Sequence, residues 1–503
     1  MKKQIAKNIT VNIFSFTVNF LAAIILTPYL VSNLGVSAYG LIPIAMFFTE
    51  YVGIITQSLS ASINRNLTLA LQSNDDSKAL EIFNTSLVVV IFIVFFQCLV
   101  SIYPIENLNN IIKIEHGFYL DAKLLFLFTL ISFSISLINS IFSVSMYSSN
   151  RLDIIQFASI FRLISKSICI FLFFSFDNIS LASVGISSII GSSVGFIITL
   201  LYWKKLTPEL RIDLRKFRKK ECIPIFSIGG WLLVNQIGFL LFSKVDILIV
   251  NKFLGSNSGG AYSIATKFSD LIRSISTVLS GVLGPVIMLY FAKNKIDEMV
   301  SISVRFIKYL SLSMSIPIIF VCIYSKSILS LWIGSEFEYL SPLVWLITLP
   351  LIINIGVTPL FSINIAMNKI KLPAIITLVL GFIGLVVSII LISETELGYY
   401  SIAISSGVIL TLKNALFTPI YASVILNQSK FKYLYLHLST LLFSLILILI
   451  FYVVNNRYRP DTYFELFLSF VVYLSFSLSL FFIMLSKDDK KILKNIVAKK
   501  FNT

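Results

Sequence analysis

The chain of 503 residues is too apolar for a soluble globular protein. Hydrophobic residues make up 57% of it and charged residues only 13%, whereas about 25% of a soluble domain is charged. The net charge of +16 is typical of some nucleic-acid-binding proteins, but here the basic residues gather between apolar runs. There they set orientation in a membrane and contact anionic headgroups, so we expect a lipid bilayer and no nucleic acid as partner.

Apolar runs of about 20 residues, enough to cross a bilayer as a helix, recur along the chain. They predict an all-α polytopic membrane protein with about 14 transmembrane helices. An outer-membrane barrel would instead show segments of about 10 residues with alternating polarity. The predicted spans are residues 10–32, 38–62, 85–104, 122–148, 154–176, 180–203, 225–250, 260–284, 302–324, 340–366, 372–393, 399–426, 433–454 and 463–486.

A hairpin near the N-terminus is repeated in the middle of the chain. Leu26–Tyr51 reads LTPYLVSNLGVSAYGLIPIAMFFTEY, and Leu34-Gly35 and Ala38-Tyr39 recur as Leu254-Gly255 and Ala261-Tyr262 within Phe226–Gly284. The offset is 220 residues before the turn and 223 after it, which predicts a second turn three residues longer. An internal repeat in an apolar chain is typical of membrane proteins with two bundles and a site between them.

The basic residues predict the topology and the domain boundaries. The two largest groups lie in the loop after the sixth span and in the C-terminal tail, whereas the predicted outer segments hold few, which places both termini in the cytoplasm. Both bundles then start on the same side, so they are parallel repeats. The predicted domains are an N-terminal six-helix bundle (1–203), a basic cytoplasmic linker (204–224), a C-terminal six-helix bundle (225–426), and two extra helices with a basic cytoplasmic tail (427–503).

Charged residues within the predicted spans are the candidate site residues. A charge at the bilayer centre costs about 2.5–3.5 kcal/mol on insertion scales, so such residues usually serve function. At about 1.5 Å per residue they lie some 10 to 21 Å from the nearest turn. The cations, expected to bind substrate, are Arg162, Lys166, Lys244, Lys267, Arg273 and Lys413. The anions, expected to couple ions or to pair with these cations, are Glu50, Asp246 and Asp270.

Two groups of these charges have alternative explanations. Lys267, Asp270 and Arg273 follow one another at i, i+3 and i+6, so they either neutralise one another along one helix face or face a ligand. Arg162 and Lys166 are like charges at i and i+4, which is destabilising without an anion. They either line an anion-facing cavity, with Arg151 continuing their stripe, or snorkel toward headgroups.

The sequence shows no catalytic motif, and we expect neither a metal nor a cofactor. The four cysteines have no metal-ligand spacing, and no phosphate-binding loop or nucleophile triad is present. Without an ATPase motif, any energy that the protein uses must come from an ion gradient or from the substrate gradient.

Several motifs resemble those of a known transporter family. They are KNITVNIFSF at the start, LVSNLGVSAYGL, VDILIVNKFLG followed by GAYSIATKF, and ILSLWIGSEF at Ile328–Phe337. On these the chain resembles the polysaccharide transporters, the Wzx-type O-antigen flippases, of the multidrug/oligosaccharidyl-lipid/polysaccharide exporter superfamily. The likeness covers the first twelve spans.

The resemblance implies a flippase of the bacterial inner membrane that serves lipopolysaccharide or other surface polysaccharide biosynthesis. Its substrate would be an undecaprenyl-diphosphate-linked oligosaccharide, moved from the cytoplasmic to the periplasmic leaflet by alternating access through a cationic central cavity. A polysaccharide polymerase and a chain-length regulator would be partners.

Three other functions stay open at this point. The sequence hardly distinguishes a lipid II flippase from an oligosaccharide flippase. A cation-coupled multidrug antiporter of the same superfamily would favour acidic cavity residues. A membrane-embedded polysaccharide polymerase or glycosyltransferase would usually present a large outer loop, whereas the longest one here, residues 105–121, is too short to fold as a domain.

Overall fold

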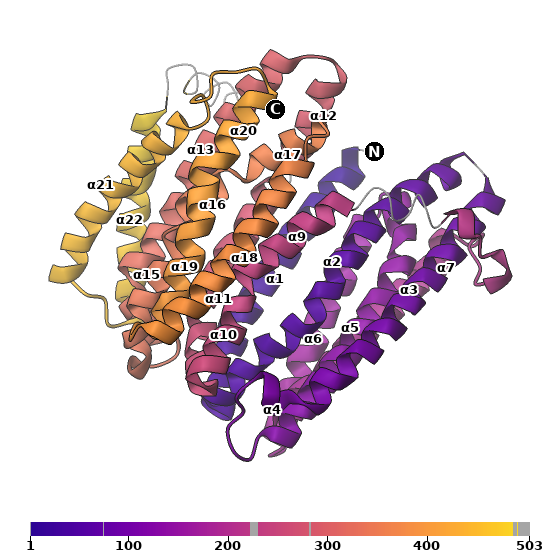
Figure 1. Ribbon diagram of the computed structural model, residues 1–503, viewed down its shortest axis with the longest axis horizontal. Coiled ribbons are helices and arrows are strands. Elements are labelled where there is room, and N and C mark those ends of the chain that lie inside the picture. Colours follow the sequence, from indigo (N-terminus) through magenta and orange to yellow (C-terminus); the bar gives the residue numbers. More distant parts are fainter. Residues whose placement is uncertain (1, 74, 222–229, 281–282, 486–489, 491–503) are drawn as a thin grey trace. The chain divides into compact units, whose positions relative to one another are not determined.

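The computed structural model describes residues 2–73, 75–221, 230–280, 283–485 and 490, and within them every regular element is a helix (Figure 1). Inside a bilayer every backbone N–H and C=O group needs a partner within the protein, which a helix provides. In chain order the elements are α1 Lys2–Leu34, α2 Val36–Gln72, α3 Asp76–Glu106, α4 Leu108–Ile111, α5 Tyr119–Ser148, α6 Leu152–Ser175, α7 Leu181–Leu206, η1 Leu214–Lys216, α9 Gly230–Ser243, α10 Val245–Leu254, α11 Ser256–Ser280, α12 Leu283–Ala292, α13 Ile296–Ile323, α14 Ser325–Trp332, η2 Ser335–Leu340, α15 Ser341–Thr348, α16 Leu351–Gly356, α17 Thr358–Ala366, α18 Lys371–Glu394, α19 Tyr399–Leu412, η3 Lys413–Phe417, α20 Thr418–Ile425, α21 Tyr435–Arg457 and α22 Tyr463–Met484.

Twelve helical segments of the described chain are long and apolar enough to cross a membrane. Each coincides with one of the predicted spans, so the prediction of an all-helical, multi-pass membrane protein is confirmed. The other two predicted spans, 38–62 and 260–284, fall on α2 and α11. These two helices carry the charged second arms of the repeated hairpin, and their crossing of the membrane stays a prediction.

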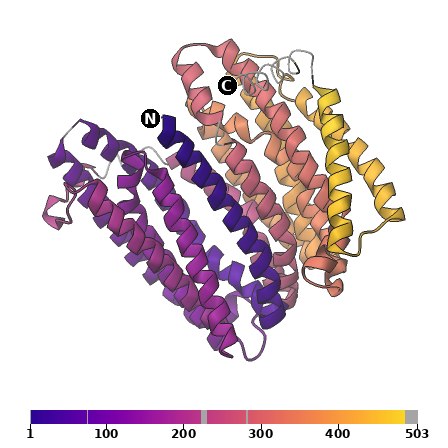
Figure 2. The ribbon, with the colours of Figure 1, turned by 180° about the vertical axis from the view of Figure 1, so that it is seen from behind.

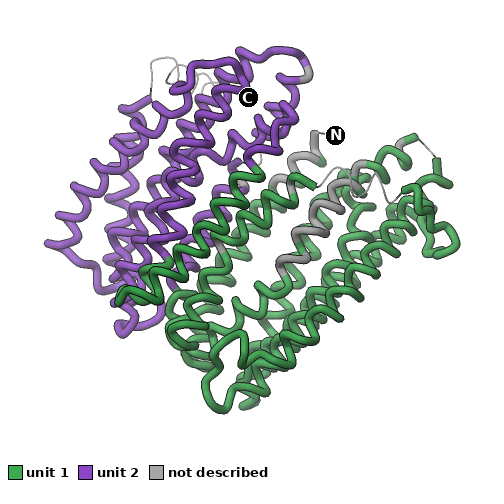
Figure 3. Tube along the Cα trace, viewed as in Figure 1, with its two compact units in different colours: residues 1–264, 374–402 green, residues 265–373, 403–503 purple. Residues whose placement is uncertain are grey.

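The chain divides into two compact units (Figure 3). Unit 1 contains residues 1–264 and 374–402, and unit 2 contains residues 265–373 and 403–503. In unit 1, α5 packs against α2 and α7, and α1 runs along α6 (Figure 2). In unit 2, α13 lies centrally and packs against α15, α16, α21 and α22. The domain boundaries drawn from the repeat rest on sequence similarity rather than on contacts, and they stay a prediction.

The repeated turns have the same backbone geometry. Gly35 has φ 81° and ψ 163°, and Gly255 has φ 94° and ψ 171°. Their N–H groups donate to the carbonyl oxygens of Val31 and Asn251, both at 2.9 Å. A positive φ favours glycine, which explains why glycine stands at both turns. The offset predicted a longer second turn, but each turn is this single glycine. The three extra residues lie instead at the start of α11, which begins at Ser256.

The two C-terminal helices, α21 and α22, lie side by side and pack on α13 of unit 2 (Figures 1 and 2). Tyr473 Oη donates to the carbonyl oxygen of Ile316 at 2.8 Å, and Asn455 Nδ2 donates to that of Ile323 at 3.1 Å. Phe451 and Tyr473 belong to the same buried core as α13. The extra helices are thus an integral part of unit 2.

Candidate substrate and ion sites

Arg162 and Lys166 lie on α6 where this helix packs against α7. Gly191 and Gly195 of α7 form a Gly-x-x-x-Gly pair, which lets two backbones approach closely. A Cβ atom on Gly191 would lie 2.5 Å from the Arg162 carbonyl oxygen and 3.0 Å from Lys166 Cβ. Lys166 is half-buried, whereas the Arg162 side chain is exposed and donates from Nη2 to Ser159 Oγ at 3.4 Å. The glycines therefore fix the position of both cations on unit 1.

Arg162 forms no ion pair with any carboxylate in the described part of the chain. Its hydrogen bond to Ser159 is long, and the acceptor is a neutral hydroxyl group. A cation within a membrane span needs water, an anion or a snorkelling path to offset its desolvation. Arg162 is therefore the predicted site cation best placed to meet an external anion.

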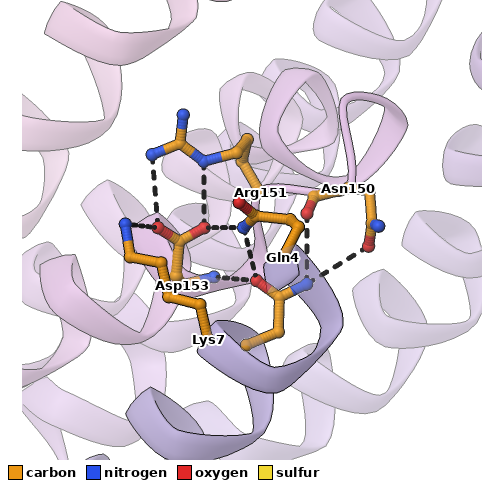
Figure 4. A network of polar contacts seen from close by, with 6 residues as sticks. Gln4, Lys7, Asn150, Arg151 and Asp153 are labelled. Atoms are coloured by element: carbon orange, nitrogen blue, oxygen red, sulfur yellow. Dashed lines mark hydrogen bonds and ion pairs between the residues drawn. The ribbon is translucent and has the colours of Figure 1, made fainter. Parts of the chain in front are cut away.

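Arg151, predicted to extend this basic stripe, is instead held by a carboxylate (Figure 4). Its Nε and Nη2 donate to Asp153 Oδ1 and Oδ2 at 3.0 and 3.2 Å, and Lys7 Nζ lies 2.8 Å from Oδ2. Gln4 Nε2 also donates to Asp153 Oδ1 at 2.8 Å. The hydrogen bond to Asp153 raises the pKa of Arg151 above its usual value. Asp153 is 4% exposed, so Arg151 serves structure here and not an anion site.

Asn8 completes this cluster from α1. Its Oδ1 accepts from Gln4 Nε2 at 2.9 Å and from the Asp153 N–H at 3.1 Å. Its Nδ2 donates to the carbonyl oxygen and to Oδ1 of Asn150, at 3.1 and 3.2 Å. The first turns of α1 are thereby tied to the start of α6. Sequence analysis missed this cluster because its members are up to 149 residues apart.

Lys244 and Asp246 lie where the predicted seventh span is broken. The helix ends at Ser243, Lys244 has φ −130° and ψ −28°, and a new helix, α10, begins at Val245. Asp246 lies in the first turn of α10, where the helix dipole stabilises a carboxylate. It is 8% exposed, and its Oδ2 accepts a hydrogen bond from Tyr262 Oη at 3.1 Å. The interruption is one residue long, since the Lys244 N–H still donates to the Leu240 carbonyl oxygen at 3.0 Å, and interrupted helices often form ion or substrate sites in transporters.

Lys267, Asp270 and Arg273 follow one another along the part of α11 that belongs to unit 2. All three side chains are half-buried, and each has an interaction partner. The choice between mutual neutralisation and a ligand role therefore stays open for this group.

Lys413 is the most buried of the predicted cations, at 7% exposure. It begins η3, a single π-helical turn between α19 and α20, and such turns often occur at functional sites. The next residue, Asn414, donates to Asn354 Oδ1 at 2.9 Å and accepts from Thr418 Oγ1 at 3.2 Å. Asn354 Nδ2 in turn donates to Thr411 Oγ1 at 3.2 Å. The buried lysine thus adjoins a polar network that sequence analysis did not detect.

The predicted site residues are shared between the two units. Unit 1 contains Arg162, Lys166, Lys244 and Asp246, and unit 2 contains Lys267, Asp270, Arg273 and Lys413. Glu50 lies on α2, but its side chain is outside the described part. A single cavity lined by all these charges stays a prediction. Among the described residues, no group of three or more His, Cys, Asp or Glu could hold a metal ion.

A family model described as "Polysaccharide biosynthesis protein" matches residues 5–291. The membrane protein EpsK of Bacillus subtilis (strain 168) is 25% identical over 427 residues, which cover 85% of each chain. A protein of Shigella flexneri named as a candidate O-antigen transporter is 23% identical over 345 residues, covering 67% of this chain and 78% of its own.

The fold is similar to that of a solved flippase. The inward closed conformation of the lipid II flippase MurJ superposes with a TM-score of 0.62 at 16% identity, covering 94% of this chain and 98% of MurJ. At this identity the likeness concerns the fold alone.

Proposed function

We propose, from the premise that the chain belongs to the polysaccharide biosynthesis protein family, that it flips an undecaprenyl-diphosphate-linked oligosaccharide across the bacterial inner membrane. Family membership makes it a multi-pass membrane transporter of the flippase type in polysaccharide biosynthesis, and not an enzyme. The substrate, the direction from the cytoplasmic to the periplasmic leaflet and the alternating-access mechanism are parts of the proposal. The proposal also includes the cytoplasmic position of both termini, and a polysaccharide polymerase and a chain-length regulator as partners.

The observation that carries the proposal is the exposed guanidinium of Arg162, one turn from Lys166, which forms no ion pair with a carboxylate among the described residues. Two cations on one helix face repel each other, and a diphosphate between them would turn this repulsion into attraction. Arginine suits phosphate because its planar fork can bind two oxygens at once. In this mechanism Lys244, Lys267, Arg273 and Lys413 supply further positive charge along the path.

Asp246 is the best candidate for the ion-coupling group. It is a buried carboxylate at the first turn of a broken helix, and Tyr262 already donates to one of its oxygens. Protonation of this carboxylate, or its contribution to a cation site, would be the coupling step. Glu50 and Asp270 remain the alternative coupling or pairing residues.

The experiment that tests this function is a leaflet-resolved analysis of lipid-linked sugars in a deletion strain. The proposal expects undecaprenyl-diphosphate oligosaccharide to accumulate on the cytoplasmic face, together with loss of the surface polysaccharide. Accumulation of lipid II on that face would assign the lipid II flippase function instead. Normal levels of both lipids with increased drug sensitivity would assign the multidrug antiporter function.

The double variant Arg162→Ala/Lys166→Ala then tests the site. In the complemented deletion strain, we expect export to fall at least about tenfold, because each charge-assisted phosphate contact contributes about 1.5–3 kcal/mol. The matched control, Lys430→Ala/Lys432→Ala, removes two exposed cations of a loop in unit 2 and should export normally. Normal export by the site variant, at unchanged protein level, would refute the assignment.

A further inference from the structure

The first part of the predicted linker, from the last turn of α7 to residue 220, is unusually rich in positive charge, and we call these residues 204–220 the basic linker. It contains eight basic and two acidic residues. A run dominated by charges of one sign would be expected to stay solvated and unfolded. The structure shows instead that the basic linker is folded onto unit 1.

Asn84 of α3 holds the middle of the basic linker. Its Nδ2 donates to the Arg211 carbonyl oxygen at 3.0 Å, and its Oδ1 accepts from the Asp213 N–H at 2.8 Å. Asn84 is fully buried at 0% exposure, so its amide replaces water for two backbone groups of the linker. The neighbouring Thr85 Oγ1 accepts from the Arg218 N–H at 3.0 Å.

Two further contacts fix the start and the end of the basic linker. Leu210 is buried in the core formed by α2, α3 and α5, and Thr207 Oγ1 lies 2.6 Å from Ser145 Oγ. Near the other end, Arg218 Nε pairs with Glu81 Oε1 at 3.2 Å. With the backbone held in this way, the remaining side chains of the linker have defined directions.

The outward side chains of the basic linker are a mixture of apolar and basic residues. Ile212, Leu214 and Phe217 are 56%, 59% and 37% exposed. Exposed basic side chains flank them, namely Lys204, Lys205, Arg211, Arg215, Lys219 and Lys220. Three exposed apolar side chains on a short polar segment are unfavourable in water. This combination is the one by which peripheral segments insert into a headgroup layer and attract anionic lipids.

We propose that the basic linker is a membrane-surface anchor that binds anionic phospholipids of the adjoining leaflet. The segment leaves directly from the end of α7, a predicted span whose last turn already carries Lys204 and Lys205. The apolar side chains therefore need to reach only the neighbouring headgroups, while the flanking cations meet lipid phosphates. An acidic soluble protein would match the charge, but it would not explain apolar residues at the end of a membrane span. This inference does not depend on the substrate proposed above.

The test uses the full-length protein in nanodiscs and a tryptophan reporter, Leu214→Trp, with Ile212→Trp as a second reporter. The reporter's fluorescence is taken as the difference from the parent chain. It is measured in two bilayers, one with brominated phosphatidylglycerol and one with the same fraction of brominated phosphatidylcholine. We expect both brominated lipids to quench the fluorescence. Quenching by the anionic lipid should be at least about twofold stronger than quenching by phosphatidylcholine, because each basic residue near the surface favours anionic lipid about fivefold.

A charge variant and its matched control decide the outcome. Neutralising Arg211, Arg215, Lys216 and Lys219 to Gln should bring the ratio of quenching close to one, and this set spares Arg218, which pairs with Glu81. The control neutralises four loop cations of unit 2, Lys293, Lys295, Lys430 and Lys432, and should leave the ratio unchanged. No quenching in either bilayer would place the linker in water, and a ratio unaffected by the charge variant would show apolar contact without lipid selection. Either result overturns the proposal.

Discussion

Replacing Asp153 by Asn removes the one charge on which the polar cluster at the start of α6 depends. The carboxylate accepts from Gln4, Lys7 and Arg151. Asn has the same shape as Asp, but its amide NH2 group replaces one carboxylate oxygen. A hydrogen-bond donor would then face the donor groups of these residues. Breaking a buried ion pair from one side typically costs about 3–5 kcal/mol. Since Lys7 and Arg151 are 54% and 33% exposed and can turn to water, we expect a loss of about 2–3 kcal/mol in unfolding free energy.

The geometry also predicts how this loss divides between the two cations. Arg151 contacts both carboxylate oxygens, so Arg151→Gln should cost about 1–1.5 kcal/mol. Lys7 makes one contact and is more exposed, so Lys7→Gln should cost about 0.5 kcal/mol. A double-mutant cycle of each with Asp153→Asn measures the coupling directly.

The assay is equilibrium unfolding of the full-length protein in mixed micelles with increasing denaturing detergent. The control is Asp297→Asn, which removes an exposed carboxylate at the start of α13 and should change the free energy by less than about 0.5 kcal/mol. A loss below about 1 kcal/mol for Asp153→Asn, or equal coupling for Lys7 and Arg151, would refute the reasoning.

Three further changes test other contacts. Gly191→Leu should prevent the approach of α6 and α7 and abolish stable folding, since even a Cβ lies 2.5 Å from a carbonyl oxygen; monodisperse protein in gel filtration would contradict this. Asn251→Ala should lower the unfolding free energy by about 2 kcal/mol, because this fully buried amide makes two hydrogen bonds to the backbone of the loop after α4. Tyr262→Phe should cost about 1.5–3 kcal/mol in the same assay, the value of a hydrogen bond to a charged group. Its repeat-related control, Tyr39→Phe, should be nearly neutral because the buried Tyr39 Oη has no hydrogen-bond partner among the described residues, and equal losses would contradict the pairing with Asp246.

The features that local patterns determine were predictable from sequence. Apolar length gave the spans, and glycine at 35 and 255 marked the two turns because only glycine tolerates their positive φ. The membrane imposes the helix on every apolar run, so hydropathy alone recovers most of the architecture.

The breaks and the long-range contacts were not predictable in the same way. No Pro or Gly occurs at residues 243–245, so nothing local announces that the seventh span ends at Ser243 and restarts at Val245. The π-helical turn at Lys413, which packs against α16, likewise has no local signal in the sequence. Asp153 was passed over because its partners on α1 lie far away in sequence. Charge in a span selected the candidates, whose role stays a prediction, and it did not identify their partners.

The interrupted seventh span also has a consequence for hydration. An α-helix leaves its first N–H groups and last carbonyl groups without intrahelical partners, and the interruption at Lys244 is one residue long, with its own N–H still donating to the Leu240 carbonyl oxygen at 3.0 Å. Inside hydrocarbon each such group must find a partner. Because this interruption loosens the regular ladder, the amides at the start of α10 should exchange with deuterium faster than those of the unbroken α13.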